Sequence, residues 1–173
     1  MIESSFLPPD VPGLIAALAI GLLIGLERGW HDRELPEGSR VAGQRTFTLT
    51  GLLGGVLGHL QPNFGAWPLV AAVLGLSLLL TVSYARTAKI SGNLSATTII
   101  AMLLTLVLGA YASHGNVTLA LTAAVIVAVF LDLKPTLHGW LRLIEHRELT
   151  ASLQLLVLSV VILPYLPNTG LGP

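Results

Sequence analysis

The residues best suited to chemistry in this chain gather where its first long apolar segment ends. Glu27 and Arg28 close that segment, and Arg45 and Thr46 open the next one. If the two segments cross a membrane as antiparallel neighbours, Glu27 is expected near Arg45, and charges at that depth are usually paired or functional. Three interpretations remain open. In the first, Glu27 and Arg45 form an ion pair that clamps the two helices, and Arg28 extends to the headgroups. In the second, Glu27 is a cation ligand or gate, and Arg45 is its counter-charge. In the third, these groups only solvate the loop.

A second charged group follows a long apolar run near the end of the chain. It consists of Asp132, Lys134 and His138. Mg²⁺ keeps most of its waters and usually takes only one or two carboxylates, so Glu27 and Asp132 are the candidate metal ligands in a shared inner vestibule. The alternative is that Asp132 caps the next turn or pairs with Lys134.

The secondary candidates are polar residues near the segment ends. Asn93, Thr97 and Thr98 precede or begin the fourth apolar segment, where they would line a path or, for Asn93, cap the helix. Arg40 belongs to the first charged loop. The sequence holds no nucleophile elbow, zinc signature or phosphate loop, so we expect no enzyme, no catalytic residue and no cofactor, with Mg²⁺ only as substrate or ligand.

The composition indicates that lipid surrounds most of this chain. Of its 173 residues, 53% are hydrophobic and only 10% are charged, whereas about a quarter are charged in soluble domains. The formal net charge is zero, so no nucleic-acid partner is expected, and the absence of cysteine excludes a disulfide framework.

The apolar runs predict an all-α, polytopic helical bundle. A membrane span needs about 20 apolar residues, and backbone groups in lipid must bond within the segment, which requires helices. We expect six spans, with a turn at 61–65 and another at 113–116: 11–29, 45–61, 67–85, 94–112, 117–133 and 149–164. The first five make a core over 1–133, an amphipathic linker at 134–148 lies along the interface, and the sixth span falls within 149–166.

The positions of the basic residues predict the orientation. All nine Lys and Arg lie in three segments that follow spans one, three and five: Arg28, Arg33, Arg40 and Arg45; Arg86 and Lys89; Lys134, Arg142 and Arg147. Short basic loops stay in the cytoplasm. Both termini are therefore expected outside and the three charged loops inside.

Glycines recur every four residues in the first two spans, as Gly21, Gly25 and Gly29 and as Gly51 and Gly55. Small residues at this spacing share a helix face and permit close backbone approach. They indicate helix packing within one chain, a seam between two copies, or thin walls around a substrate path. A homo-oligomer is expected, with a dimer favoured.

The motifs of 21–30 (Gly-Leu-Leu-Ile-Gly-Leu-Glu-Arg-Gly-Trp) and 38–47 (Gly-Ser-Arg-Val-Ala-Gly-Gln-Arg-Thr-Phe) resemble the MgtC/SapB membrane family over about residues 11–60. Thr97 and Thr98 are similar to the family's Gly-x-Thr-Thr segment, with a different spacing. Residues 132–166 resemble a long subgroup in which a second membrane domain follows, so a further domain or a separate subunit is expected.

The resemblance implies a multi-pass protein of the bacterial inner membrane, linked to magnesium limitation and to membrane partners such as ATPases. Two functions are expected from it and from the residues. One is a transporter or channel-like protein for a cation such as Mg²⁺. The other is a non-transporting regulatory or assembly subunit that contacts partner helices.

Overall fold

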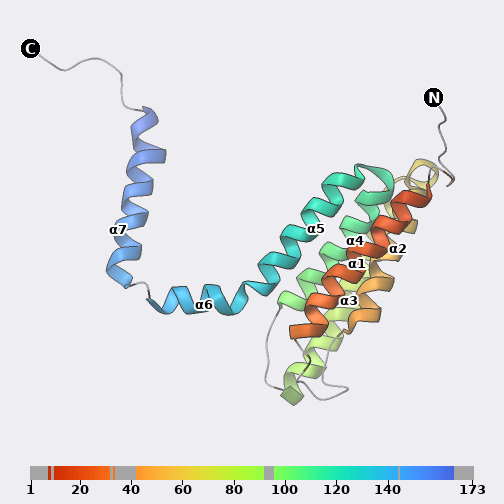
Figure 1. Cartoon of the computed structure of the whole chain (residues 1–173), viewed down its shortest axis with the longest axis horizontal. Coiled ribbons are helices and arrows are strands. Elements are labelled where there is room, and N and C mark those ends of the chain that lie inside the picture. The colour runs from red at the N-terminus through yellow and green to blue at the C-terminus, as the bar shows by residue number, and fades with distance from the viewer. Residues whose placement is uncertain are drawn as a thin grey trace, which may run out of the picture. The chain divides into compact units, whose positions relative to one another are not determined.

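A computed structural model describes residues 8, 10–31, 33, 42–91, 96–143 and 145–165 of the chain. The chain divides into two compact units, Met1–Asp132 and Leu133–Pro173. Every element in the described part is helical, which confirms the predicted all-α bundle (Figure 1). Three described helices are long and apolar enough to cross a membrane: Val11–His31, Thr97–His114 and His146–Tyr165.

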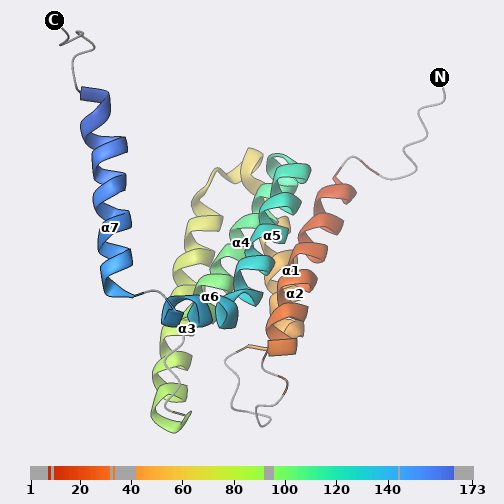
Figure 2. The same ribbon diagram turned by 60° about the vertical axis from the view of Figure 1, so that its left-hand side comes forward.

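The first unit contains five helices joined by short connections or by segments outside the described residues. They are α1 (Val11–His31), α2 (Gln44–Phe64), α3 (Trp67–Ser91), α4 (Thr97–His114) and α5 (Val117–Asp132). Helices α1, α2 and α4 pack most closely, α5 packs on α1 and α4, and α3 lies at the edge against α2 and α4 (Figure 2). Four of the five predicted spans match a helix to within three residues at each end, and α3 continues to Ser91, six residues beyond its predicted end at 85.

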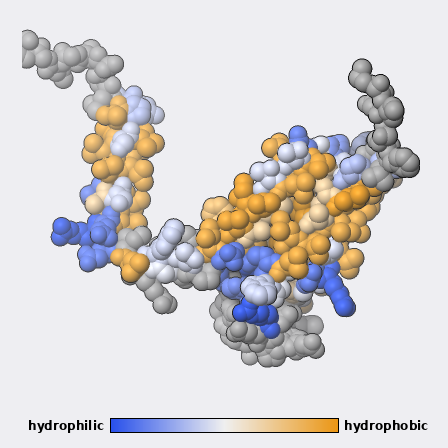
Figure 3. Space-filling view, in the orientation of Figure 1, coloured by the Kyte–Doolittle hydropathy of each residue, from blue (hydrophilic) through white to orange (hydrophobic). Residues whose placement is uncertain are grey.

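The first unit has a small buried core and a large apolar exterior, as a protein surrounded by lipid does. The largest fully buried side chains are Ile20, Ile24, Phe47, Met102, Leu106 and Thr105. Many leucines and valines face outward instead, and the visible face of the bundle is mostly hydrophobic with hydrophilic residues towards its ends (Figure 3). Such a surface exceeds what water tolerates and fits hydrocarbon.

The glycine stripes hold the helices of one chain together. A Cβ on Gly21 would come within 2.8 Å of the Thr48 Cα, and one on Gly25 within 2.9 Å of the Gln44 carbonyl oxygen. A Cβ on Gly51 would overlap the carbonyl oxygen of Ala17. A Cβ on Gly55 would overlap the Cβ of Ala17 in α1, whereas one on Gly29 would meet only the Gln44 side chain at 3.9 Å. Four of the five predicted glycines are therefore occupied by α1–α2 packing and are not an open seam for a second copy.

Helix α2 continues one turn beyond the predicted break. Pro62 lies inside the helix, and the turn to α3 falls at Gly65 and Ala66. The N–H of Gly65 donates to the Gln61 carbonyl at 2.8 Å, and its φ of +68° is a conformation that glycine adopts without strain. The polar residues at 61–63 suggested an early turn, but the glycine fixes its position. The second predicted turn is confirmed, since α4 ends at His114 and the Asn116 Oδ1 accepts from the Leu119 N–H to cap α5.

The second unit contains α6 (Lys134–Leu143), α7 (His146–Leu156), a π-helical segment η1 (Val157–Ile162) and a 3₁₀ turn η2 (Leu163–Tyr165). The amphipathic linker predicted at 134–148 contains one helix, α6, and the start of another, α7, which begins after Glu145. There a capping box joins Glu145 and Glu148 and starts α7. Pro164 lacks an N–H to continue an α-helix, and the preceding turns widen so that the Leu163 N–H donates to the Leu158 carbonyl.

Candidate functional site

The last turn of α1 holds a buried ion pair between neighbours in the sequence. The Arg28 Nε lies 2.5 Å from the Glu27 Oε2, and the Nη2 lies 2.5 Å from the Oε1. The side chain of Arg28 is only 3% exposed and that of Glu27 only 12% exposed. Both carboxylate oxygens therefore accept from one guanidinium, which is the strong bidentate form of such a pair.

Arg28 also anchors a helix that is distant in sequence. Its Nη2 donates to the carbonyl oxygen of Leu131 at 3.3 Å, in the last turn of α5. The final carbonyls of a helix have no partner within it, and a cation there also interacts favourably with the helix dipole. The Arg28 guanidinium therefore neutralises Glu27 and caps the C-terminal end of α5 at the same time.

The predicted clamp between Glu27 and Arg45, with Arg28 extended to the headgroups, is wrong. Arg28 lies on the buried face of α1, one turn after Ile24 and Gly25, so its side chain points into the bundle. The antiparallel argument placed Glu27 and Arg45 at the same end of α1 and α2, but the rotation of α1 about its axis decides which charges meet. The spacing of Arg28 in the stripe with Gly21 and Gly25 is a signal that would have revealed its burial.

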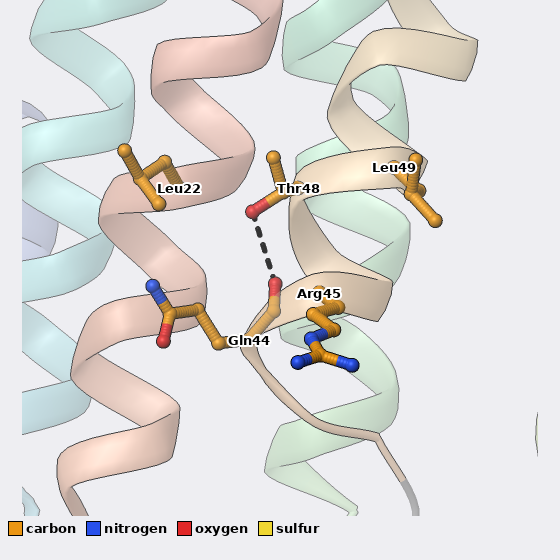
Figure 4. Close-up of a pocket in the computed structure, with 5 residues that line it drawn as sticks. All are labelled: Leu22, Gln44, Arg45, Thr48 and Leu49. Atoms are coloured by element: carbon orange, nitrogen blue, oxygen red, sulfur yellow. Dashed lines mark hydrogen bonds between the residues drawn. The ribbon is translucent and has the colours of Figure 1, made fainter.

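Arg45 and Thr46 lie exposed in the first turn of α2, where Arg45 makes no ion pair with any described residue. Arg45 lines an open groove of about 480 Å³ together with Leu22, Gln44, Thr48 and Leu49. Figure 4 shows Gln44 pointing towards α1 and the Thr48 hydroxyl donating to the Gln44 carbonyl, at 3.0 Å. The sequence interpretation missed Gln44, Leu22 and Leu49 because a groove depends on which side chains stay uncovered.

Asp132 is exposed at the end of α5, one residue after the carbonyl that Arg28 holds. The structure therefore brings Glu27, Arg28 and the end of α5 together, while Arg45 lines the separate groove. No group of three or more His, Cys, Asp or Glu side chains within the described residues could hold a metal ion. Glu27 and Asp132 as metal ligands remain a prediction.

The secondary candidates are only partly described. Thr97 and Thr98 begin α4 and are half-buried, and the residue before them, Ala96, gives α4 no side-chain cap. Lys134 is half-buried and belongs to the second unit, in α6. Arg40, Asn93 and the side chain of His138 lie outside the described residues.

Comparison with models of protein families shows which family this chain belongs to. The model of the MgtC family matches residues 14–140, which is most of the chain. The chain belongs to the MgtC family. The match to MgtC extends far beyond the motifs at 21–47 and includes the Glu27–Arg28 pair, the groove and the end of α5. No curated protein and no solved structure matches the chain.

Proposed function

We propose that this MgtC-family protein is a non-transporting regulatory subunit of the bacterial inner membrane that acts through helix–helix contacts with partner membrane proteins. The observation that carries the proposal is the amide of Gln154, which is exposed on the membrane-length segment His146–Tyr165. A second observation supports the proposal: both carboxylate oxygens of Glu27 already accept hydrogen bonds from Arg28.

Gln154 lies well inside the membrane-length segment His146–Tyr165. Its side chain is exposed, and no described residue bonds to its amide. The hydroxyls of Thr150 and Ser159 on the same segment instead donate to the carbonyls of His146 and Leu155. An amide left unpaired in hydrocarbon is costly, and glutamine side chains bond across helices in membranes. The Gln154 amide, which offers both donors and an acceptor, is therefore the group on this span that we expect to contact another helix.

Glu27 is poorly placed for a cation pathway. Its two oxygens already accept from Arg28, and Arg28 in turn holds α5. Binding a cation would require this buried pair to open, which leaves a guanidinium uncompensated. These contacts favour a structural role for Glu27 and hence the regulatory function over the transport function.

Replacing Gln154 with leucine is expected to weaken the contact with the partner about fivefold, because interhelical polar bonds in membranes contribute about 1 kcal/mol. The chain has no cysteine, so Ala151→Cys places a single thiol one turn before Gln154. Crosslinking this thiol in native membranes is expected to give an adduct whose mass differs from twice that of the chain. The measured quantity is the fraction of the chain in that adduct, with and without Gln154→Leu.

The matched control is Ser159→Ala, which removes a hydroxyl that is already bonded to Leu155 and is expected to leave the adduct unchanged. An adduct of twice the chain mass would place the contact between two copies and contradict the regulatory proposal in favour of the dimer. An adduct that is insensitive to Gln154→Leu, or no adduct, would also contradict it.

The transport alternative is tested with purified protein in liposomes that contain a Mg²⁺-sensitive dye. Entry of Mg²⁺ is expected to be no faster than in protein-free liposomes, because Glu27 is neutralised within the bundle. Entry that exceeds the protein-free rate and falls on Glu27→Gln would reject the regulatory function.

A further inference from the structure

The groove beside Arg45 combines a cationic end with an apolar wall. Gln44 and Arg45 belong to the first turn of α2, while Leu22 and Leu49 lie deeper, at the level of Thr48 (Figure 4). Arg45 and Leu49 are exposed, and Leu22 is 37% exposed. A ligand that fills this groove must present a negative group at one end and hydrocarbon beside it.

The walls of the groove are held in place by close packing of α1 on α2. Gly21 faces the backbone of Phe47 and Thr48, and Gly25 faces that of Gln44, with no room for a side chain at either position. The two helices therefore cannot slide closer together and close the groove. Ligand sites are usually preformed in this manner.

The charge of the groove selects among the molecules that surround a membrane protein. The Arg45 guanidinium has no carboxylate partner among the described residues. It belongs to the segments that contain all nine Lys and Arg, which are expected on the cytoplasmic side. That leaflet is rich in anionic lipids, and basic pockets between helices on this side bind their headgroups.

We propose that this groove binds one anionic glycerophospholipid, with its phosphate at Arg45 and an acyl chain along Leu22 and Leu49. Arg45 supplies the positive charge for the phosphate, and no carboxylate among the described residues neutralises it. The two leucines distinguish a lipid from a free anion, because a phosphate alone would leave them uncovered. This site is independent of the helix contact proposed at Gln154.

The test is titration of the delipidated full chain with phosphatidylglycerol or phosphatidylcholine, with bound lipid counted by native mass spectrometry. Arg45→Gln is expected to weaken phosphatidylglycerol binding about fivefold, the effect of one basic residue near an anionic headgroup. Binding of phosphatidylcholine is expected to be weaker in the parent chain and unchanged by the substitution. Arg45→Lys, which keeps the charge, is expected to restore most of the binding.

The matched control is Arg147→Gln, which removes an equal charge from an exposed position at the start of α7. This substitution is expected to change phosphatidylglycerol binding by no more than about twofold. That change is smaller than the contribution of a basic residue that contacts a headgroup. Equal losses from Arg45→Gln and Arg147→Gln would show diffuse attraction and overturn the proposal. Displacement of the lipid by millimolar inorganic phosphate would also overturn it, because the site would then recognise a free anion.

Discussion

Replacing Gly54 with alanine is expected to lower the free energy of unfolding by about 2 to 3 kcal/mol, the upper part of the usual cost of overpacking. A Cβ at this position would overlap the carbonyl oxygen of Leu106, with the backbone N–H of Ala110 at 3.0 Å. These are backbone atoms of α4, which cannot rotate away as a side chain can. This value already includes the opposing gain of about 1 kcal/mol that alanine has over glycine in a helix. The measurement is reversible unfolding of the purified chain in mixed micelles.

Gly75→Ala in α3 is the matched control. The same methyl group is added within a helix, but a Cβ at Gly75 would meet nothing within 4 Å. This variant is expected to be neutral or more stable by up to about 1 kcal/mol, because only helix propensity changes. Equal destabilisation by the two substitutions would contradict the close crossing of α2 and α4.

The second large effect is expected at Arg28. Arg28→Met should lower the free energy of unfolding by about 3 to 5 kcal/mol, because removal of one partner leaves a buried charge uncompensated. Glu27 would lose both of its hydrogen bonds, and the Leu131 carbonyl would lose its donor. Unfolding in mixed micelles again gives the measurement.

The double variant Glu27→Leu with Arg28→Met distinguishes a lost pair from lost packing. Replacing both charges with apolar groups is expected to recover most of the stability, since such pairs contribute little beyond an apolar equivalent. Arg45→Met serves as the control, and at its exposed position we expect a change within about 0.5 kcal/mol. Similar losses from Arg28→Met and Arg45→Met, or no recovery in the double variant, would contradict the proposed role of Arg28.

The spans were predictable from sequence because length and charge determine where a helix meets the edges of a membrane. Asp10, the 61–65 turn and the basic segments bounded the apolar runs, and the helices of the first unit follow them closely. The exact ends depended on local bonds that composition does not encode. The left-handed Gly65 after α2 and the capping box at Glu145 are two such cases.

The sequence predicted that Glu27, Arg28 and Arg45 lie at the ends of helices but not which of them pair. Glu27, Arg28 and Arg45 were recognised as neighbours at one end of the helices. Which of them meet depends on the faces that α1 and α2 present to each other, and those faces follow from glycine contacts such as Gly25 on Gln44. The stripe of Gly21, Gly25 and Arg28 contained this information, whereas the contact between Arg28 and Leu131 spans 103 positions and has no local signature.

The bond between Glu27 and Arg28 has a consequence for biogenesis. Because the two residues are adjacent in the chain, their charges can neutralise each other as soon as α1 leaves the ribosome, before any other helix has been made. We therefore expect α1 to enter the bilayer without waiting for a distant counter-charge. When α5 is synthesised much later, it meets a guanidinium donor that is already in place, so the last helix of the first unit docks onto the first.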